Sequence, residues 1–168
     1  MQAVFKKREM KTIVICGYSG VGKTTFCQRQ PFSIDIDSAE IPKDEKFVKE
    51  YLKRITACIG RYRYICVSTH AVLIDALADM KLSVVLVYPD LKLKREYIRR
   101  YLARGNSYAY AKNIESTWHI NLETLKHEVR FPAIVLSSGE YLLDWLPYLE
   151  RITSVSYTHL TLPTTSRV

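Results

Sequence analysis

One eight-residue stretch constrains the fold of this chain more than any other feature. Residues 17–24 read Gly-Tyr-Ser-Gly-Val-Gly-Lys-Thr and match the pattern G-x-x-x-x-G-K-[ST] without a gap. The apolar, β-branched residues 12–16 before it predict a strand, and residues 24–30 after it predict a helix. Glycines allow such a connection to curl so that successive N–H groups point at phosphate oxygens, and the helix N-terminus adds positive partial charge. The stretch therefore predicts a phosphate-binding loop.

The residues of this loop have defined expected roles. Lys23 should reach the β- and γ-phosphates of a nucleoside triphosphate and act in catalysis, while the Thr24 hydroxyl should bind Mg²⁺. ATP and Mg²⁺ are therefore the expected cofactors. The alternative is an ordinary glycine turn with a solvated Lys23. The predicted nucleotide-binding residues in this part of the chain are Gly17, Tyr18, Ser19, Gly20, Val21, Gly22, Lys23, Thr24 and Thr25.

The rest of the chain alternates short apolar runs with helical periods. Strands are predicted at 12–16, 32–36, 64–68, 83–88 and 132–136. Helices are predicted at 24–30, 45–59, 72–80, 91–104, 108–129 and 141–149. Because each strand is followed by a helix, the pattern predicts an α/β fold, a three-layer sandwich with a five-stranded parallel sheet covered on both faces.

Length and composition indicate one globular domain. The chain has 168 residues, 25 basic and 17 acidic, for a formal net charge of +8. A basic excess of this size fits a nucleotide phosphate as well as a nucleic acid. No apolar run reaches the roughly 18 residues of a membrane helix, no secretory signal is apparent, and the four cysteines show no C-x-x-C spacing. We expect a cytoplasmic protein with reduced cysteines and no membrane association.

The two ends differ from the middle of the chain. We expect residues 1–9 to be an N-terminal extension and residues 10–152 to form the domain. Residues 153–168 contain eight Ser or Thr and no acidic residue, and we expect a disordered or artefactual tail. Within it, residues 155–164 resemble a translated sequencing-library adapter.

With its loop in strand–helix context, the chain resembles the P-loop NTPases. Among them it is most similar to the nucleoside-monophosphate-kinase group and its shikimate- and gluconate-kinase relatives, over roughly residues 10–149, and to small nucleotide-kinase-like proteins of bacteriophages and gut bacteria. The guanine-recognition and switch motifs of GTPases are absent from the sequence, and the predicted strand 64–68 ends in Ser-Thr-His without the acidic pair of a motor ATPase.

The resemblance implies roles for residues outside the loop. Acids after the second strand make Asp35 a candidate for binding Mg²⁺ or its water, and Asp37 a candidate for binding the acceptor or acting as base. Both would lie on one face of a strand; the alternative is that each caps a neighbouring element. Arg100 and Arg104, four residues apart, would clamp the transferring phosphoryl group from a mobile lid, or else belong to a solvated basic face.

The resemblance also places two further residues near the site. Gly139 falls where the related kinases hold adenine with main-chain groups, although it fits a plain turn as well. His70 follows the third strand, on the acceptor side, although a lone histidine is more often structural.

Together these features predict a Mg²⁺-dependent P-loop kinase that moves the ATP γ-phosphate to a small acceptor such as a nucleoside monophosphate. Two alternatives remain: a 5′-polynucleotide kinase, suggested by the basic predicted helix 91–104 and by the basic residues 6–8, and a non-catalytic ATP-binding regulator. Nucleic acid is thus an expected partner only in the first alternative.

Overall fold

The structure, a computed structural model, describes residues 10–154. Five parallel strands form one sheet in the order β2-β3-β1-β4-β5. In chain order the strands are β1 (Ile13–Gly17), β2 (Ser33–Asp35), β3 (Tyr64–Val67), β4 (Ser83–Pro89) and β5 (Ala133–Leu136). Every residue of β1 and β3 is buried, which explains why these strands read as continuous apolar runs and not as alternating patterns.

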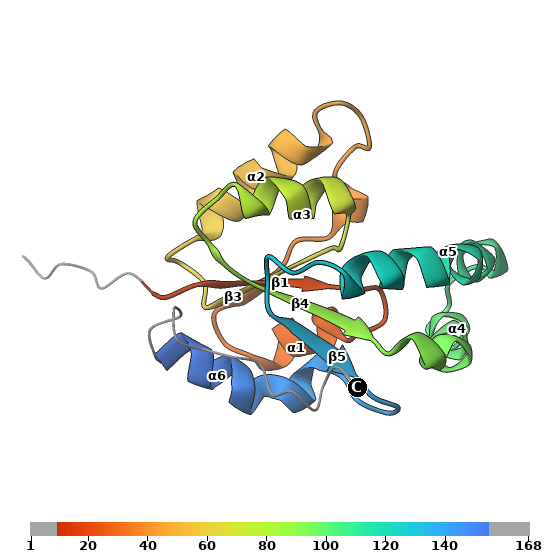
Figure 1. The fold of residues 1–168 in the computed structure, drawn as a ribbon. Helices are drawn as coiled ribbons and strands as arrows, with labels where there is room; N and C mark the ends of the chain where they lie inside the picture. Colours follow the sequence, from red (N-terminus) through yellow and green to blue (C-terminus); the bar gives the residue numbers. More distant parts are fainter. Residues whose placement is uncertain (1–9, 155–168) are drawn as a thin grey trace, which may run out of the picture.

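Helices cover both faces of this sheet. They are α1 (Lys23–Arg29), α2 (Phe47–Cys58), α3 (Ala71–Ala78), α4 (Lys94–Ala103), α5 (Tyr108–Lys126) and α6 (Leu146–Ser154). Figure 1 shows α2 and α3 on one face and α1 and α6 on the other, while α4 lies beyond the carboxyl end of β4. The predicted three-layer α/β sandwich with a five-stranded parallel sheet is confirmed.

Two predicted helices are each divided into a 3₁₀ turn and an α-helix. The segment 91–104 begins as η2 (Leu91–Leu93), where the Asp90 carboxylate accepts a hydrogen bond from Lys92 N, and continues as α4. The segment 141–149 divides into η3 (Leu142–Trp145) and α6. Pro147 has no N–H to donate in a continuous helix, so it is accommodated in the first turn of a new one.

The described residues include only a small part of the predicted ends. Helix α6 continues to Ser154, two residues past the expected domain boundary. The rest of the predicted tail and the predicted N-terminal extension, residues 155–168 and 1–9, lie outside the described residues. Between residues 10 and 154, no helix has the length and apolar character needed to cross a membrane.

Candidate functional site

The glycine loop joins β1 to α1 in a conformation that its glycines permit. Gly20 and Gly22 have φ angles of 90° and 93°, in a region that residues with a Cβ rarely adopt. A Cβ added at Gly17 would lie 2.9 Å from a side-chain atom of Val21 and from one of Lys23. The absence of a side chain at Gly17 therefore leaves room for the stem of Lys23.

Hydrogen-bond donors and a cation converge at this loop. Lys23 Nζ donates to the Gly17 carbonyl, and burial lowers the pKa of Lys23 while the Asp35 and Asp37 carboxylates act in the opposite direction. The first N–H groups of a helix have no partner within it, and Gly22, the N-cap of α1, has no side chain to cap them. These donors are the set that a polyphosphate requires.

Two oxygen ligands suited to Mg²⁺ lie next to the loop. Thr24 Oγ1, at the start of α1, donates a 3.2 Å hydrogen bond to Asp35 Oδ2, at the end of β2. Burial raises the pKa of Asp35, and the nearby Lys23 ammonium lowers it in part. Within residues 10–154, no three His, Cys, Asp or Glu side chains are grouped to hold a metal ion. A Mg²⁺ ion on Thr24 and Asp35 would therefore complete its shell with water and phosphate oxygens, which is its usual mode of binding.

Asp37 is not in the strand that was expected to align it with Asp35. Strand β2 ends at Asp35, and the exposed Asp37 carboxylate accepts a 2.9 Å hydrogen bond from Ala39 N as the N-cap of η1 (Ser38–Glu40). Its present hydrogen bond is thus that of a capping residue. The carboxylate is nevertheless close enough to Lys23 to favour the charged form of that lysine.

Arg100 connects three segments of the site. Its guanidinium donates to the carbonyl of Gly20 at 3.0 Å and to the carbonyl of Glu140 at 3.3 Å, and it pairs with Glu96 at 3.2 Å. It also lies between two aromatic rings, 4.3 Å from the Tyr97 centroid and 4.0 Å from that of Tyr141. Arg100 is therefore next to the phosphate loop, and three of its hydrogen bonds are made to protein groups.

Ser19 receives most of the remaining contacts between the loop and the α4–α5 segment. Tyr101 Oη donates to the Ser19 carbonyl at 2.7 Å, and Ser19 Oγ hydrogen-bonds to Tyr110 Oη at 2.7 Å. Arg104, which is exposed, donates to the same Ser19 hydroxyl at 3.1 Å. Since Tyr97 and Tyr101 are fully buried and Tyr101 is bonded to Ser19, α4 is packed on the loop in this structure.

This packing makes a specific prediction for Gly20. A Cβ at Gly20 would lie 2.9 Å from Tyr101 Cε1 and 3.1 Å from Tyr97 Cδ1. Gly20→Ala should therefore lower the free energy of unfolding by about 2–4 kcal/mol, combining positive-φ strain with overpacking. Gly105→Ala is the matched control, because Gly105 has a φ of 95° and nothing within 4 Å of its added Cβ. Denaturant unfolding that gave equal losses for both variants would contradict close packing of α4 on the loop.

The connection that follows β5 lies against both α4 and the phosphate loop. Gly139 has a φ of 74°, Ser138 Oγ donates to Glu96 Oε1 at 2.6 Å, and Gly139 N donates to Glu96 Oε2 at 3.4 Å. The Ser138 hydrogen bond is the main cause of the lowered pKa of Glu96. Leu142 N donates to the Val21 carbonyl at 2.8 Å. The connection that contains Gly139 is thus attached to both α4 and the phosphate loop.

The ends of β2 and β3 are joined by a buried tyrosine. Tyr51 Oη donates to the Ile36 carbonyl at 2.7 Å and accepts from Ser68 N at 2.9 Å. His70 lies just beyond, as the N-cap of α3, with its ring edge-on to Phe47 at 5.1 Å. Burial, and then the charges of Lys43 and Lys23, lower the pKa of His70.

Three residues that hold the site together, Tyr51, Glu96 and Tyr101, are not identified from the sequence. Tyr51 and Tyr101 fall in the apolar stripes of their helices, where a core role is the simpler interpretation. Glu96 had a usable signal, because it is the single acid among seven basic residues in segment 92–112. A lone acid in such a segment is a candidate for a specific ion pair.

The comparisons with known proteins support the fold. No protein-family model matches the sequence, and no curated protein matches it significantly. Among solved structures, the chain is similar to the tunicamycin resistance protein of Deinococcus radiodurans, with a TM-score of 0.54 and 14% sequence identity. The match covers 91% of this chain and 100% of that one. The protein thus shares the overall fold of that structure, an α/β sandwich around a five-stranded parallel sheet.

Proposed function

We propose that this protein is a Mg²⁺-dependent phosphotransferase that moves the γ-phosphate of ATP to a small acceptor. The observation that carries the proposal is the arrangement at the start of α1. There Lys23 lies within the glycine loop, and Thr24 is hydrogen-bonded to Asp35 across to β2. A cation, uncapped N–H groups and two metal-binding oxygens at one point are what phosphoryl transfer from a nucleotide requires.

Each residue has a defined part in this proposal. The loop N–H groups and Lys23 bind the phosphates and stabilise the negative charge of the transition state. Thr24 and Asp35 hold Mg²⁺, which supplies further charge neutralisation when bound. Arg104 stabilises the transferring group, and Gly139 contributes main-chain contacts to adenine. Asp37 orients the acceptor hydroxyl or takes its proton; a phosphate acceptor needs no base.

The acceptor is proposed to bind where β2 and β3 end. Asp37 and His70 lie there, on the opposite side of β1 from the Gly139 connection. A nucleoside monophosphate is the leading acceptor class. Because the structural relative is described as a tunicamycin resistance protein, tunicamycin is a second compound to test.

A non-catalytic ATP-binding regulator is the second candidate function. The observation that favours it is Arg100, whose guanidinium is used by Gly20, Glu140 and Glu96. Such an arginine stabilises the loop without contributing to group transfer.

A turnover assay distinguishes these functions. Calorimetry with and without Mg²⁺ measures ATP binding, and γ-labelled ATP is then offered with nucleoside monophosphates, sugars, tunicamycin and 5′-hydroxyl oligonucleotides. We expect Mg²⁺-dependent ATP binding and transfer to a small acceptor. ATP binding without transfer to any acceptor would support the regulator, and folded protein that does not bind ATP would exclude both functions.

The two arginines should behave differently when removed. Arg104→Ala should lower kcat with little change in ATP affinity, because Arg104 is exposed and contacts only the Ser19 hydroxyl of the loop. Arg100→Ala should instead weaken ATP binding and lower the melting temperature, because it removes contacts to two connections at once. Calorimetry, melting curves and steady-state kinetics on both variants test this, and the reverse pattern would contradict the proposed roles of both arginines.

A further inference from the structure

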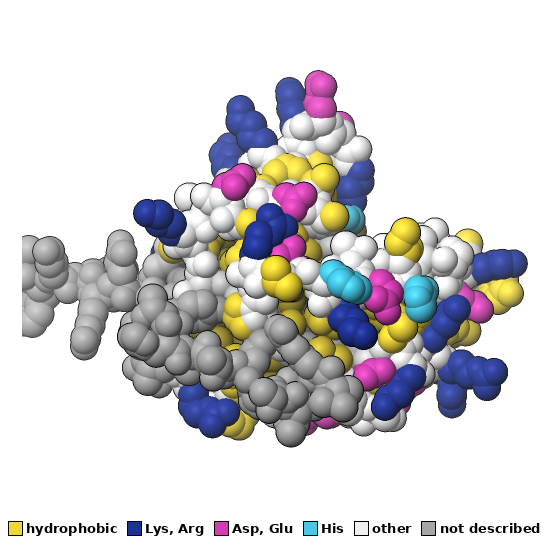
Figure 2. Space-filling view, viewed as in Figure 1, with side chains coloured by type: hydrophobic (Ala, Val, Ile, Leu, Met, Phe, Trp, Pro, Cys, Tyr) yellow, Lys and Arg dark blue, Asp and Glu magenta, His cyan; other side chains and the backbone are white. Residues whose placement is uncertain are grey.

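The positive charge of this protein is concentrated in one segment. Residues 92–112 contain seven Lys or Arg and one Glu. The other described residues, 10–91 and 113–154, contain 14 basic and 15 acidic side chains. The net positive charge of the described chain therefore comes entirely from η2, α4 and the start of α5. Figure 2 shows several of these Lys and Arg side chains over the part of the molecule that α4 and α5 form.

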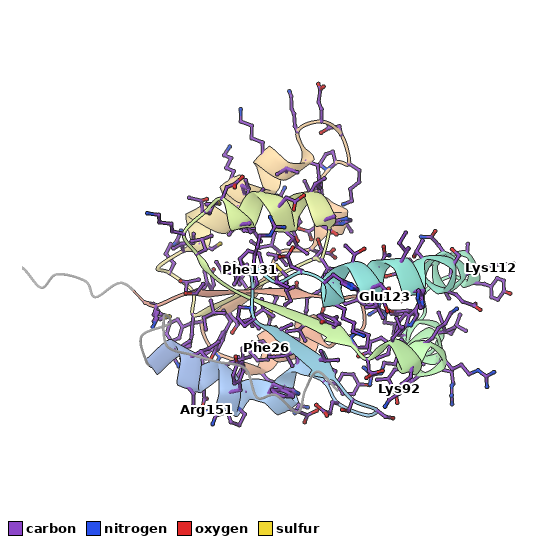
Figure 3. The ribbon with its side chains drawn as sticks, in the orientation of Figure 1. Phe26, Lys92, Lys112, Glu123, Phe131 and Arg151 are labelled. Atoms are coloured by element: carbon purple, nitrogen blue, oxygen red, sulfur yellow. The ribbon has the colours of Figure 1, made fainter. Side chains whose placement is uncertain are left out.

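Most of these charges are not neutralised within the protein. The single acid, Glu96, pairs with Arg100. The other six cations have no ion-pair partner among residues 10–154. Of these, Arg104 hydrogen-bonds to Ser19 and Asn106, and the remaining five are Lys92, Lys94, Arg95, Arg99 and Lys112. We call these five residues the basic surface. All of them except Lys94, which is half-buried, are exposed. Figure 3 shows Lys112 at the outer end of α5 and Lys92 below α4.

An aromatic ring lies at the same outer end. Tyr108, at the start of α5, is 72% exposed, and Lys112 Nζ lies 5.9 Å from the centre of its ring. Exposed aromatic rings among cations are the elements with which proteins bind single-stranded nucleic acid, by base stacking and by phosphate contacts.

We propose that the basic surface, together with Tyr108, binds single-stranded nucleic acid. The C-terminal end of α4 contacts the phosphate loop through Arg104 and Ser19, so a strand bound here would lie beside the nucleotide site. An anionic membrane fits less well, because the apolar face of α4 is already buried through Tyr97 and Tyr101. Leu102 is the exposed large apolar side chain that α4 has left to insert. This proposal does not depend on whether the protein transfers phosphate.

Fluorescence anisotropy with a labelled single-stranded oligonucleotide of about 20 nucleotides, without ATP, tests the proposal. Five phosphate contacts predict a log–log dependence of affinity on salt with a slope of about −3.5. The double variant Arg95→Glu/Arg99→Glu should weaken binding at least tenfold and reduce the slope to about −2, because two contacts are lost. Tyr108→Ser should weaken binding roughly fivefold or more with the slope unchanged, because it removes stacking and no charge.

A matched double variant controls for net charge. Lys49 and Lys53 are exposed and spaced i,i+4 on α2, as Arg95 and Arg99 are on α4. Lys49→Glu/Lys53→Glu should reduce affinity far less than the α4 double variant. Equal effects of the two double variants, no oligonucleotide binding at low salt, or binding to anionic phosphatidylserine vesicles in preference to the oligonucleotide would each overturn the proposal. Unchanged ATP binding in both variants shows that the phosphate loop is intact.

Discussion

Lys23→Ala should reduce turnover roughly 10²- to 10³-fold, the effect of about 3–4 kcal/mol expected when one preorganised charge or donor at a transition state is removed. Lys23 is held ready for this role, since its Nζ donates to the Gly17 carbonyl within the loop. Burial lowers the pKa of Lys23, because the buried ammonium is poorly solvated. The negative charge of a bound phosphate would stabilise that ammonium. Steady-state kinetics and calorimetry measure the change in kcat and in ATP affinity.

Two further lysine variants serve as comparisons for Lys23→Ala. Lys23→Arg should not restore turnover. The Lys23 stem lies directly against Gly17, and a planar guanidinium is larger than the compact ammonium that it would replace. Lys53→Ala, on the exposed side of α2, should leave turnover unchanged. Wild-type kcat in Lys23→Ala would exclude the glycine loop as the site of phosphoryl transfer.

The phosphate loop could be predicted because its signal is local. The positive φ angles at Gly20 and Gly22 and the position of Lys23 at the start of α1 all follow from eight consecutive residues between a strand and a helix. The parallel sheet was predictable for a related reason. Strands that are buried on both faces appear in the sequence as continuous apolar runs, which are easy to recognise, and helices separate them.

The contacts around the loop could not be predicted, because they join residues far apart in the sequence. The Arg100 bond to Gly20 spans 80 residues, and the Tyr101 bond to Ser19 spans 82. Spacing places Arg100 on a helix face but does not determine whether that face meets solvent, substrate or protein. The same holds for Asp37, because β2 ends at Asp35, two residues before it, and a local N-cap bond replaces the expected strand geometry.

Replacing Asp35 should impair function without lowering stability. If the Asp35 carboxylate holds Mg²⁺ or its water, Asp35→Asn should lower metal affinity and the Mg²⁺-dependent turnover by roughly 10- to 100-fold. The same substitution should not lower the melting temperature at neutral pH. Asparagine keeps an oxygen that can accept the hydrogen bond from Thr24 Oγ1 while removing a charge that burial disfavours.

The pH dependence of stability follows from the direction of the Asp35 shift. Burial raises its pKa above the ordinary value of 3.8, by more than the Lys23 charge lowers it. The folded protein therefore binds the Asp35 proton more tightly than the unfolded chain does, so ionised Asp35 disfavours folding. The stability of Asp35→Asn relative to wild type should rise as the pH increases from 3.8 through the folded-state pKa and then remain constant.

Asp75→Asn is the matched control for Asp35→Asn. Asp75 is exposed and pairs with Arg130 at 2.7 Å, so its loss should change stability by less than about 1 kcal/mol and leave turnover intact. Melting curves between pH 3 and 8, with Mg²⁺-dependent kinetics at neutral pH, complete the comparison. Full activity in Asp35→Asn would place the Mg²⁺ ligand elsewhere. A lower melting temperature at neutral pH would mean that the attraction between Asp35 and Lys23 outweighs the burial of the carboxylate, and that this charge is there to support the fold.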